Sequence, residues 1–380
     1  MLTIGVVKTS FKEHEQRVPI YPEHVLWIDK EIRKNIFFEE GYGHEYGFSD
    51  DFIAKNSRGC LTRDELFKNC DLILLAKPVV ADLQKMKEHQ ILCGWSHCVQ
   101  QHDIAQAAIE RKLTIIAWEA MNCWSNADHK LLHIFYRNNE LAGYAAVLHV
   151  LQLRGVDGHY GPRRHVAVIS YGAVSRGAIY ALQGRGFNNI HVYTQRPVHL
   201  VADQNPDVYY AQYFRDNSGN LFAKLPDGSI KPFIDELALA DIICNGILQD
   251  TDTPYIFVNH SQISKLKPNS IIIDISCDKG MGFSFAQPTT FEKPAFKIGN
   301  NILYYSVDHT PAYLWDAASR EISRALIPYL PILISGNQAW QQDETVRRAI
   351  EIQDGSICND KILRFQNREN TYPYIIKQAR

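Results

Sequence analysis

The chain has 380 residues, of which 46% are hydrophobic and 22% are charged, and its formal net charge is −2. A chain of this length exceeds what one core usually supports, so two domains are expected. The near-neutral charge argues against a broad basic surface for nucleic acid. No apolar run is long enough to span a membrane and the N-terminus lacks a signal-peptide pattern, so we expect a soluble cytoplasmic protein. The eight cysteines form no C-x-x-C pair and are expected to be free thiols rather than metal ligands.

The first 120 residues alternate short apolar runs with amphipathic segments. Runs at 2–7, 71–78, 91–95 and 114–119 are typical of buried strands, and helices are expected at 23–32 and 50–55. Strands that alternate with helices indicate a parallel sheet. We therefore predict an α/β domain at this end of the chain.

Three basic residues stand where such a sheet gathers ligand-binding side chains. Lys77 and His97 each follow a buried strand, and Arg17 lies in a proline-rich loop after the first strand. A guanidinium held in place suits a carboxylate, because its donors match both carboxylate oxygens. Taken singly, each residue also has an ordinary interpretation: a solvated charge for Arg17 and Lys77, or a hydrogen-bonded core histidine for His97.

A second domain is predicted after a long helix at 131–153 and a turn-rich linker. Its first strand, 166–170, breaks into a glycine turn that leads to a helix, a context in which helix N-terminal amides can face a phosphate. The turn fits G-x-G-x-x-G only at Gly172, because serines stand at the first and third glycine positions, so an ordinary strand–helix turn remains an alternative. The predicted phosphate-binding residues are Ser170, Gly172, Ala173, Val174, Ser175, Arg176 and Gly177.

The strand at 190–193 bears on the choice of cofactor. An NAD-binding unit would place an acidic residue near its end to accept from the ribose 2′-OH, and none is there. Arg196 stands where an arginine could hold a 2′-phosphate, so NADP is predicted over NAD. Further buried strands at 241–246 and 270–278 end in polar residues, from which Asn245, Gly246 and Asp278 are predicted to contact the cofactor.

The rest of the chain is predicted to return to the first domain. A hairpin is expected at 221–233 around Asp227-Gly228. The return follows the segment 304–311, with helices at 317–330 and 344–352 after it. No metal site is predicted.

Several stretches together resemble the alanine dehydrogenase / pyridine nucleotide transhydrogenase superfamily. They are RVPIYPEHV around Arg17, LLAKP around Lys77, GWSHCVQQ around His97, NELAG at 139–143 and DISCDKG around Asp278. The resemblance implies that Lys77 and His97 are catalytic and that Asp278 faces the nicotinamide. It also implies an α/β fold of two Rossmann-like domains with parallel sheets joined by long helices. The nucleotide-binding domain, 131–304, would be inserted in a substrate domain formed by 1–130 and 305–380.

Within the superfamily, the blocks 245–254, 274–291 and 307–323 are most similar to the N5-(carboxyethyl)ornithine synthase group. This resemblance implies NADPH-dependent reductive condensation of pyruvate with the side-chain amine of ornithine or lysine. Arg17, Lys77, His97, Asp308 and His309 would bind substrate, and Arg17 and Asp278 would join Lys77 and His97 in catalysis. Further candidates for binding the distal amino acid, among which the sequence does not choose, are Glu119, Glu140 and Asp316.

Other activities stay open. The segment 307–311 also resembles a motif of fungal saccharopine dehydrogenases, so an alanine dehydrogenase or saccharopine dehydrogenase-type amino-acid oxidoreductase is an alternative. A non-catalytic nucleotide-binding subunit is another. The sequence does not decide between a monomer and a homo-oligomer.

Overall fold

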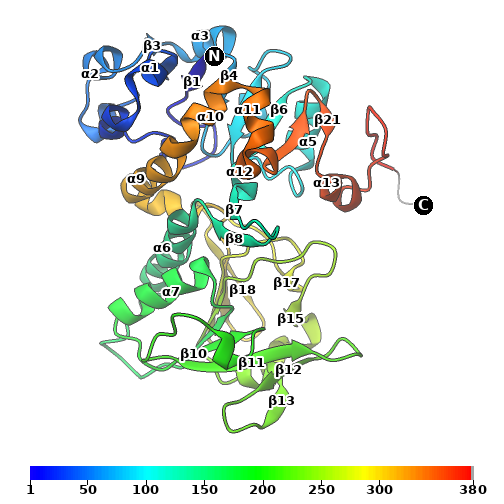
Figure 1. Ribbon diagram of the computed structural model, residues 1–380. Coiled ribbons are helices and arrows are strands. Elements are labelled where there is room, and N and C mark those ends of the chain that lie inside the picture. The colour runs from blue at the N-terminus through cyan, green and yellow to red at the C-terminus, as the bar shows by residue number, and fades with distance from the viewer. Residues whose placement is uncertain (378–380) are drawn as a thin grey trace. The chain divides into compact units, whose positions relative to one another are not determined.

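The structure is a computed structural model that describes residues 1–377. The chain divides into two compact units: unit 1 contains Met1–Tyr136 and the segment from Trp315 onward, and unit 2 contains Arg137–Leu314. The sequence placed these boundaries at 130/131 and 304/305. Each unit is built on its own sheet (Figure 1).

Unit 1 contains an eight-stranded sheet in the order β21-β20-β6-β5-β4-β1-β2-β3. The six strands from β6 to β3 are parallel to one another, whereas β20 and β21 are antiparallel at one edge. The parallel part has the doubly wound 3-2-1-4-5-6 order, in which ligands bind outside the carboxyl ends of the strands near the point where the order reverses. The bounds are β1 (Ile4–Val6), β2 (Ile36–Glu39), β3 (Gly59–Leu61), β4 (Leu72–Leu74), β5 (Ile91–Gly94), β6 (Thr114–Ala117), β20 (Ile350–Gln353) and β21 (Ser356–Ile357).

The helices of unit 1 differ from the sequence prediction at two places. The predicted helix at 23–32 is a 3-10 helix followed by one α turn, because Ile28 and Asp29 are extended and the Asp29 side chain caps the new turn. The predicted helix at 344–352 is wrong in its second half: α12 ends at Arg347, and β20 pairs with β6 through Ile350 and Ile352. The bounds are η1 (Pro22–Trp27), α1 (Lys30–Arg33), α2 (Asp50–Lys55), α3 (Arg63–Asn69), α4 (Val80–Leu83), α5 (His102–Glu110), η3 (Trp118–Ala120), α9 (Trp315–Leu326), α10 (Leu330–Ser335), α11 (Asn337–Gln342), α12 (Glu344–Arg347) and α13 (Asp360–Phe365).

Unit 2 repeats the same architecture. Its sheet has the order β13-β12-β11-β10-β9-β14-β16-β19-β18, and the six strands from β11 to β19 are parallel in the 3-2-1-4-5-6 order. The edges are antiparallel, and the predicted hairpin around Asp227-Gly228 is confirmed as β12–β13. The bounds are β9 (Val166–Ile169), β10 (Ile190–Thr194), β11 (Tyr209–Arg215), β12 (Leu221–Lys224), β13 (Ile230–Pro232), β14 (Ile242–Asn245), β15 (Ile256–Val258), β16 (Ile271–Asp274), β17 (Gly282–Phe283), β18 (Ala295–Ile298) and β19 (Ile302–Tyr305).

Two helices of unit 2 pack closely, as the green ribbons α6 (Tyr136–Arg154) and α7 (Ala173–Gly184) show in Figure 1. A Cβ on Gly177 would lie 1.8 Å from the Glu140 carbonyl oxygen, and one on Gly143 would lie 1.8 Å from that of Val174. The backbones therefore touch where both glycines lack side chains. The predicted start of α6 at residue 131 is wrong, because Lys130–His133 forms β8, which pairs with β7 (Asn122–Trp124).

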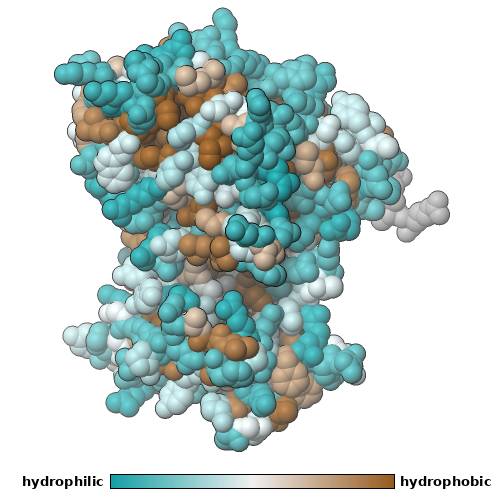
Figure 2. All heavy atoms as spheres, in the orientation of Figure 1, coloured by the Kyte–Doolittle hydropathy of each residue, from teal (hydrophilic) through white to brown (hydrophobic). Residues whose placement is uncertain are grey.

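Each sheet is buried on both faces, which explains why its strands read as continuous apolar runs. In β4, for example, Leu72 and Leu74 belong to one core and Ile73 to the other. The predicted α/β class with two Rossmann-like domains is confirmed. The face drawn in Figure 2 is largely hydrophilic, with apolar side chains in separate groups. No helix within residues 1–377 is long and apolar enough to cross a bilayer, and all eight cysteines are free thiols.

Candidate active site

Arg17 is buried in the loop that follows β1, with only 3% of its side chain exposed. Its Nε donates to Glu15 Oε1 at 2.8 Å and its Nη2 donates to Glu15 Oε2 at 2.5 Å. The guanidinium also lies over the Trp95 ring, 5.1 Å from its centroid. Glu15, a residue that sequence reasoning missed, therefore fixes one edge of the guanidinium; the E-x-R spacing is the signal that could have found it.

Lys77 is half-buried just beyond the end of β4, in front of Pro78. The chain segments after β4 and β5 run close together here, since Trp95 N–H donates to the Ala76 carbonyl at 3.0 Å. Gly94 permits this approach, because a Cβ at that position would lie 1.9 Å from the Leu75 carbonyl oxygen. The fold thus brings the end of β4, with Lys77, next to the end of β5, with His97.

His97 follows β5 in a left-handed backbone conformation, with φ of 47°. Such a conformation is costly for a residue with a side chain and persists where surrounding contacts impose it. The contact here is Glu119, just after β6: its Oε1 accepts from the His97 backbone N–H, and lies 3.9 Å from His97 Nδ1. The sequence offered Glu119 for the distal part of the substrate, whereas the structure places it beside His97.

Glu119 is held in an unusual electrostatic environment. Burial raises its pKa first of all, the nearby Glu351 carboxylate raises it further, and Lys77 lowers it. Ser96 Oγ also donates to Glu119 Oε1 at 3.4 Å, while Oε2 is buried without a hydrogen-bond partner. Titratable groups with perturbed pKa values at the carboxyl edge of a doubly wound sheet are typical of an active site. Glu119 is such a group, and together with Lys77 and His97 it forms a cluster that we call the acid–base cluster.

The β9–α7 turn in unit 2 has the geometry expected at a phosphate site. Ser170 has a φ of 82°, and its Oγ accepts from Gly172 N–H at 3.3 Å. Gly172 is exposed and is the N-cap residue of α7. Because glycine has no side chain, the N-cap residue does not cover the first backbone amides of α7. Such a helix start attracts anions. Ala173, Val174 and Arg176 follow in the first turn.

Ser175 and Gly177 serve packing in this arrangement. Ser175 is fully buried and donates to the Ile169 carbonyl at 3.2 Å. A Cβ on Gly246, just after β14, would lie 2.5 Å from Ser175 Oγ, so the end of β14 passes directly beside α7. These contacts hold the start of α7 against the end of β14 at the β9/β14 switch point, the place where a doubly wound sheet binds its ligand.

A buried network lies at the ends of β14, β16 and β19. Asp274 Oδ1 accepts from Asn245 Nδ2 at 2.9 Å, and Asp274 Oδ2 accepts from the Tyr304 hydroxyl at 2.5 Å. Burial raises the pKa of Asp274 to about 7, and Asp278 adds to the shift. Asp274 anchors both Asn245 and the start of the turn that carries Asp278, since Cys277 N–H donates to it at 3.4 Å. Sequence reasoning missed Asp274, although an acid ending a buried apolar strand was the available signal.

Arg196 is exposed immediately after β10. Among residues 1–377 no carboxylate forms an ion pair with its guanidinium, and neither Thr194 nor Gln195, the two residues before it, is acidic. Arg176 by contrast lies over the Tyr171 ring and 3.8 Å from Asp203 Oδ2. Arg196 is thus the more accessible cation on this edge of unit 2.

Asp308 and His309 follow β19 and bind one another, with 2.6 Å between Asp308 Oδ1 and His309 Nδ1. His309 is 2% exposed and packs edge-on against Phe291. Thr310 Oγ1 donates to the Ala142 carbonyl of α6 at 2.9 Å. This segment ties α6 to the sheet of unit 2, with Asp308 the more accessible member of the pair.

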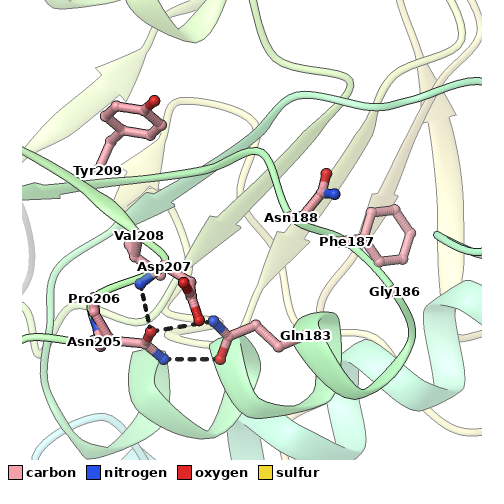
Figure 3. Close-up of a pocket in the computed structure, with 9 residues that line it drawn as sticks. All are labelled: Gln183, Gly186, Phe187, Asn188, Asn205, Pro206, Asp207, Val208 and Tyr209. Carbon is pink, nitrogen blue, oxygen red and sulfur yellow. Dashed lines mark hydrogen bonds between the residues drawn. The ribbon is translucent and has the colours of Figure 1, made fainter.

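A separate pocket of about 750 Å³ in unit 2 is drawn in Figure 3. Gln183 and Asn205 join their side-chain amides across it at 2.8 Å, and Tyr209 lines it at the start of β11. It lies at the amino ends of β10 and β11, opposite to the edge that holds Ser170 and Arg196. It is therefore distinct from the β9/β14 switch point described above.

The predicted site residues fall into two groups. Unit 1 holds Arg17, Lys77 and His97 at the carboxyl edge of its parallel strands. Unit 2 holds the turn 170–177, Arg196, Asn245, Gly246, Asp278, Asp308 and His309. Two doubly wound units with polar and charged side chains at the carboxyl edges of their strands are typical of two-domain oxidoreductases that use a pyridine nucleotide.

The chain belongs to the alanine dehydrogenase/PNT family. Its N-terminal domain model matches residues 5–136 and its C-terminal domain model matches residues 198–360. The chain is 27% identical to N(5)-(carboxyethyl)ornithine synthase of Clostridium botulinum over 82% of this chain and 89% of that protein. It is 21% identical to alanine dehydrogenase of Mycobacterium tuberculosis over 94% of this chain and 95% of that protein.

Solved structures agree on the fold. An L-alanine dehydrogenase superposes with a TM-score of 0.72 at 17% identity, covering 96% of this chain and 99% of that one. A transhydrogenase from Sinorhizobium meliloti superposes with a TM-score of 0.68 at 15% identity, covering 94% of this chain and 99% of that one. Relatives of this chain are oxidoreductases that act on small molecules.

Proposed function

We propose that the protein catalyses the NADPH-dependent reductive condensation of a 2-oxo acid, pyruvate, with the side-chain amine of ornithine or lysine. The product would be an N-(1-carboxyethyl) amino acid. The observation that carries the proposal is the acid–base cluster: an ammonium, an imidazole and a carboxyl at the ends of β4, β5 and β6. Similarity to N(5)-(carboxyethyl)ornithine synthases over most of both chains supports this choice of substrates.

The reaction sets definite tasks for the side chains of unit 1. The amine adds to the oxo carbon, and the oxo oxygen must gain protons and leave as water before the carbon–nitrogen bond is reduced. Arg17, whose guanidinium is held rigidly by the Glu15 carboxylate, would bind the oxo acid carboxylate. Lys77 and His97 would supply protons to the departing oxygen, which is general acid–base catalysis.

The side chains of unit 2 fit a bound NADPH. The open helix start at Gly172 suits its diphosphate, and the exposed Arg196 suits a 2′-phosphate. When bound, the nucleotide supplies the hydride, so that oxo acid, amine, NADPH and one proton give product, NADP⁺ and water. Asp278 would orient the nicotinamide ribose or stabilise the cationic imine, with Asn245 and Gly246 beside it. Asp308 and His309 would border the amine site.

The test is a screen of substrates by absorbance of the reduced cofactor. Pyruvate and 2-oxoglutarate would each be paired with ornithine, lysine and ammonia. We expect the highest kcat/KM with pyruvate and ornithine or lysine. Ammonia as the best amine would select the alanine dehydrogenase reaction, and 2-oxoglutarate with lysine would select the saccharopine type. Nucleotide binding without oxidation across the whole panel would leave a non-catalytic nucleotide-binding subunit.

A further inference from the structure

The turn that carries His97 is bound by a side chain from the C-terminal segment of unit 1. Gln366 is the C-cap residue of α13 and is 1% exposed. Its Nε2 donates to the carbonyl oxygens of Cys98 at 2.7 Å and Val99 at 3.1 Å, the two residues that follow His97. The family model that matches this end of the chain stops at residue 360, so it does not describe this contact.

Arg368 fixes the direction in which the Gln366 amide points. Its guanidinium is buried, and its Nε donates to Gln366 Oε1 at 2.6 Å. Its Nη1 donates to Gln106 Oε1 at 2.8 Å and to the Tyr374 carbonyl at 3.0 Å, so Arg368 is itself anchored to α5 and to the C-terminal segment. Because a guanidinium can only donate, the amide oxygen must face Arg368 and the amide nitrogen must face the turn.

The turn from His97 to Gln101 is held by contacts on two sides. On one side, the His97 N–H donates to Glu119 Oε1. On the other side, Gln366 binds the two carbonyls that follow His97. The left-handed φ of 47° at His97 is a conformation that persists where surrounding contacts impose it. Loss of the Gln366 donors would remove a partner from two buried residues' carbonyls and favour a rearranged turn.

We propose that Gln366 is a positioning residue, which holds the turn 97–101 and thereby the imidazole of His97 in place. It acts through the backbone of Cys98 and Val99. The consequence for turnover rests on the proposed function, in which His97 supplies protons to the substrate. The effect of Gln366 on the placement of His97 does not depend on that function.

Gln90 offers a matched control at the opposite end of β5. It is also 1% exposed and makes hydrogen bonds of the same kind: its Nε2 donates to two backbone carbonyls and its Oε1 accepts from one donor. The partners, in that order, are Phe67 at 2.8 Å, Cys70 at 2.7 Å and the Lys87 N–H at 3.1 Å. Gln90 lies just before β5 begins, whereas His97 follows its end. Loss of either amide should lower the melting temperature, and only loss of the Gln366 amide should disturb His97.

The test compares methionine and glutamate at both positions. Methionine has nearly the length of glutamine, adds no charge and cannot donate. Glutamate at 366 keeps an acceptor for Arg368, and the carboxylate that is paired with this guanidinium cannot donate to the turn. The first readout is the NMR signal of the His97 imidazole in histidine-labelled, ligand-free protein, assigned by its loss in His97→Gln. This signal should shift or split in Gln366→Met and Gln366→Glu and stay in place in Gln90→Met and Gln90→Glu.

The second readout is turnover of pyruvate with ornithine. Both Gln366 variants should lose about 10- to 100-fold in kcat with an unchanged Kd for NADPH, whereas both Gln90 variants should keep kcat within about twofold. An unchanged His97 signal in folded Gln366→Met, or an equal displacement in Gln90→Met, would overturn the proposal. If Gln366→Met does not fold, Gln366→Glu decides by the same criterion. A displaced signal in a protein that turns over no substrate pair would support the positioning role and reject the proposed function alone.

Discussion

Replacing Gly177 by alanine should force α6 and α7 apart. The new Cβ would lie 1.8 Å from the Glu140 carbonyl oxygen and 2.6 Å from its carbonyl carbon, whereas real Cβ contacts are essentially never below 3.0 Å. Both obstructing atoms belong to backbone, so no side chain can rotate out of the way. Overpacking of this kind costs about 3 kcal/mol at the upper end of its usual range, and the higher helix propensity of alanine returns about 1 kcal/mol, so we expect a net loss of about 2 kcal/mol.

The matched control is Gly184→Ala on the same helix. A Cβ there meets nothing within 4 Å, so this variant should gain a few tenths of a kcal/mol. All six tryptophans (Trp27, Trp95, Trp118, Trp124, Trp315 and Trp340) lie in unit 1.

Thermal unfolding can therefore be followed by two probes. Tryptophan fluorescence reports on unit 1, and far-UV circular dichroism reports on both units. Gly177→Ala should lower the midpoint seen by circular dichroism by about 5 °C and Gly184→Ala should not. Equal midpoints for the two variants would refute the close approach of α6 and α7.

Four other outcomes are expected. Lys77→Met should lose at least about 100-fold in kcat while its Kd for NADPH is unchanged, because general acid–base groups contribute that much; near-wild-type kcat would remove Lys77 from the mechanism. Arg196→Glu should lower kcat/KM for NADPH far more than for NADH, and an equal preference in the unaltered protein would already contradict this role. Glu15→Gln should raise KM for the oxo acid with little change in Kd for NADPH, since it loosens the Arg17 guanidinium. The pKa of Asp274 is higher in the folded state than in the unfolded state, so its contribution to stability falls as pH rises from about 4 through about 7. Between these pH values the melting temperature of Asp274→Asn should therefore fall less steeply with pH than that of the unaltered protein. The same pH dependence in both proteins would refute the raised pKa.

The sequence predicted those parts of the site that end a buried strand. Lys77 and His97 each close an apolar run, so their place at the sheet edge followed from the run itself. Arg17 was predicted from its place in a proline-rich loop. Glu15, the acid that binds its guanidinium, was not predicted, because a hydrogen bond between residues so near in sequence depends on the local turn.

Other features depended on tertiary contacts. Glu351 was expected in the helix predicted at 344–352; only pairing with β6 makes it a strand residue. Gly177 was expected to contact a phosphate, and its contact with Glu140 could not be inferred without knowing that α6 crosses α7. The antiparallel strands β20 and β21 at the edge of the unit 1 sheet were likewise not predicted, because the sequence does not show that this segment pairs with β6.

The most direct test of the proposed reaction follows atoms rather than absorbance. The protein would be incubated with pyruvate, ornithine labelled with heavy nitrogen at the side-chain amine, and NADPH deuterated at its hydride-donating carbon, and the products would be analysed by mass spectrometry. The proposed condensation predicts one product that contains both the heavy nitrogen and one deuterium on the former oxo carbon. Deuterium found in alanine or lactate, with ornithine recovered unchanged, would contradict it.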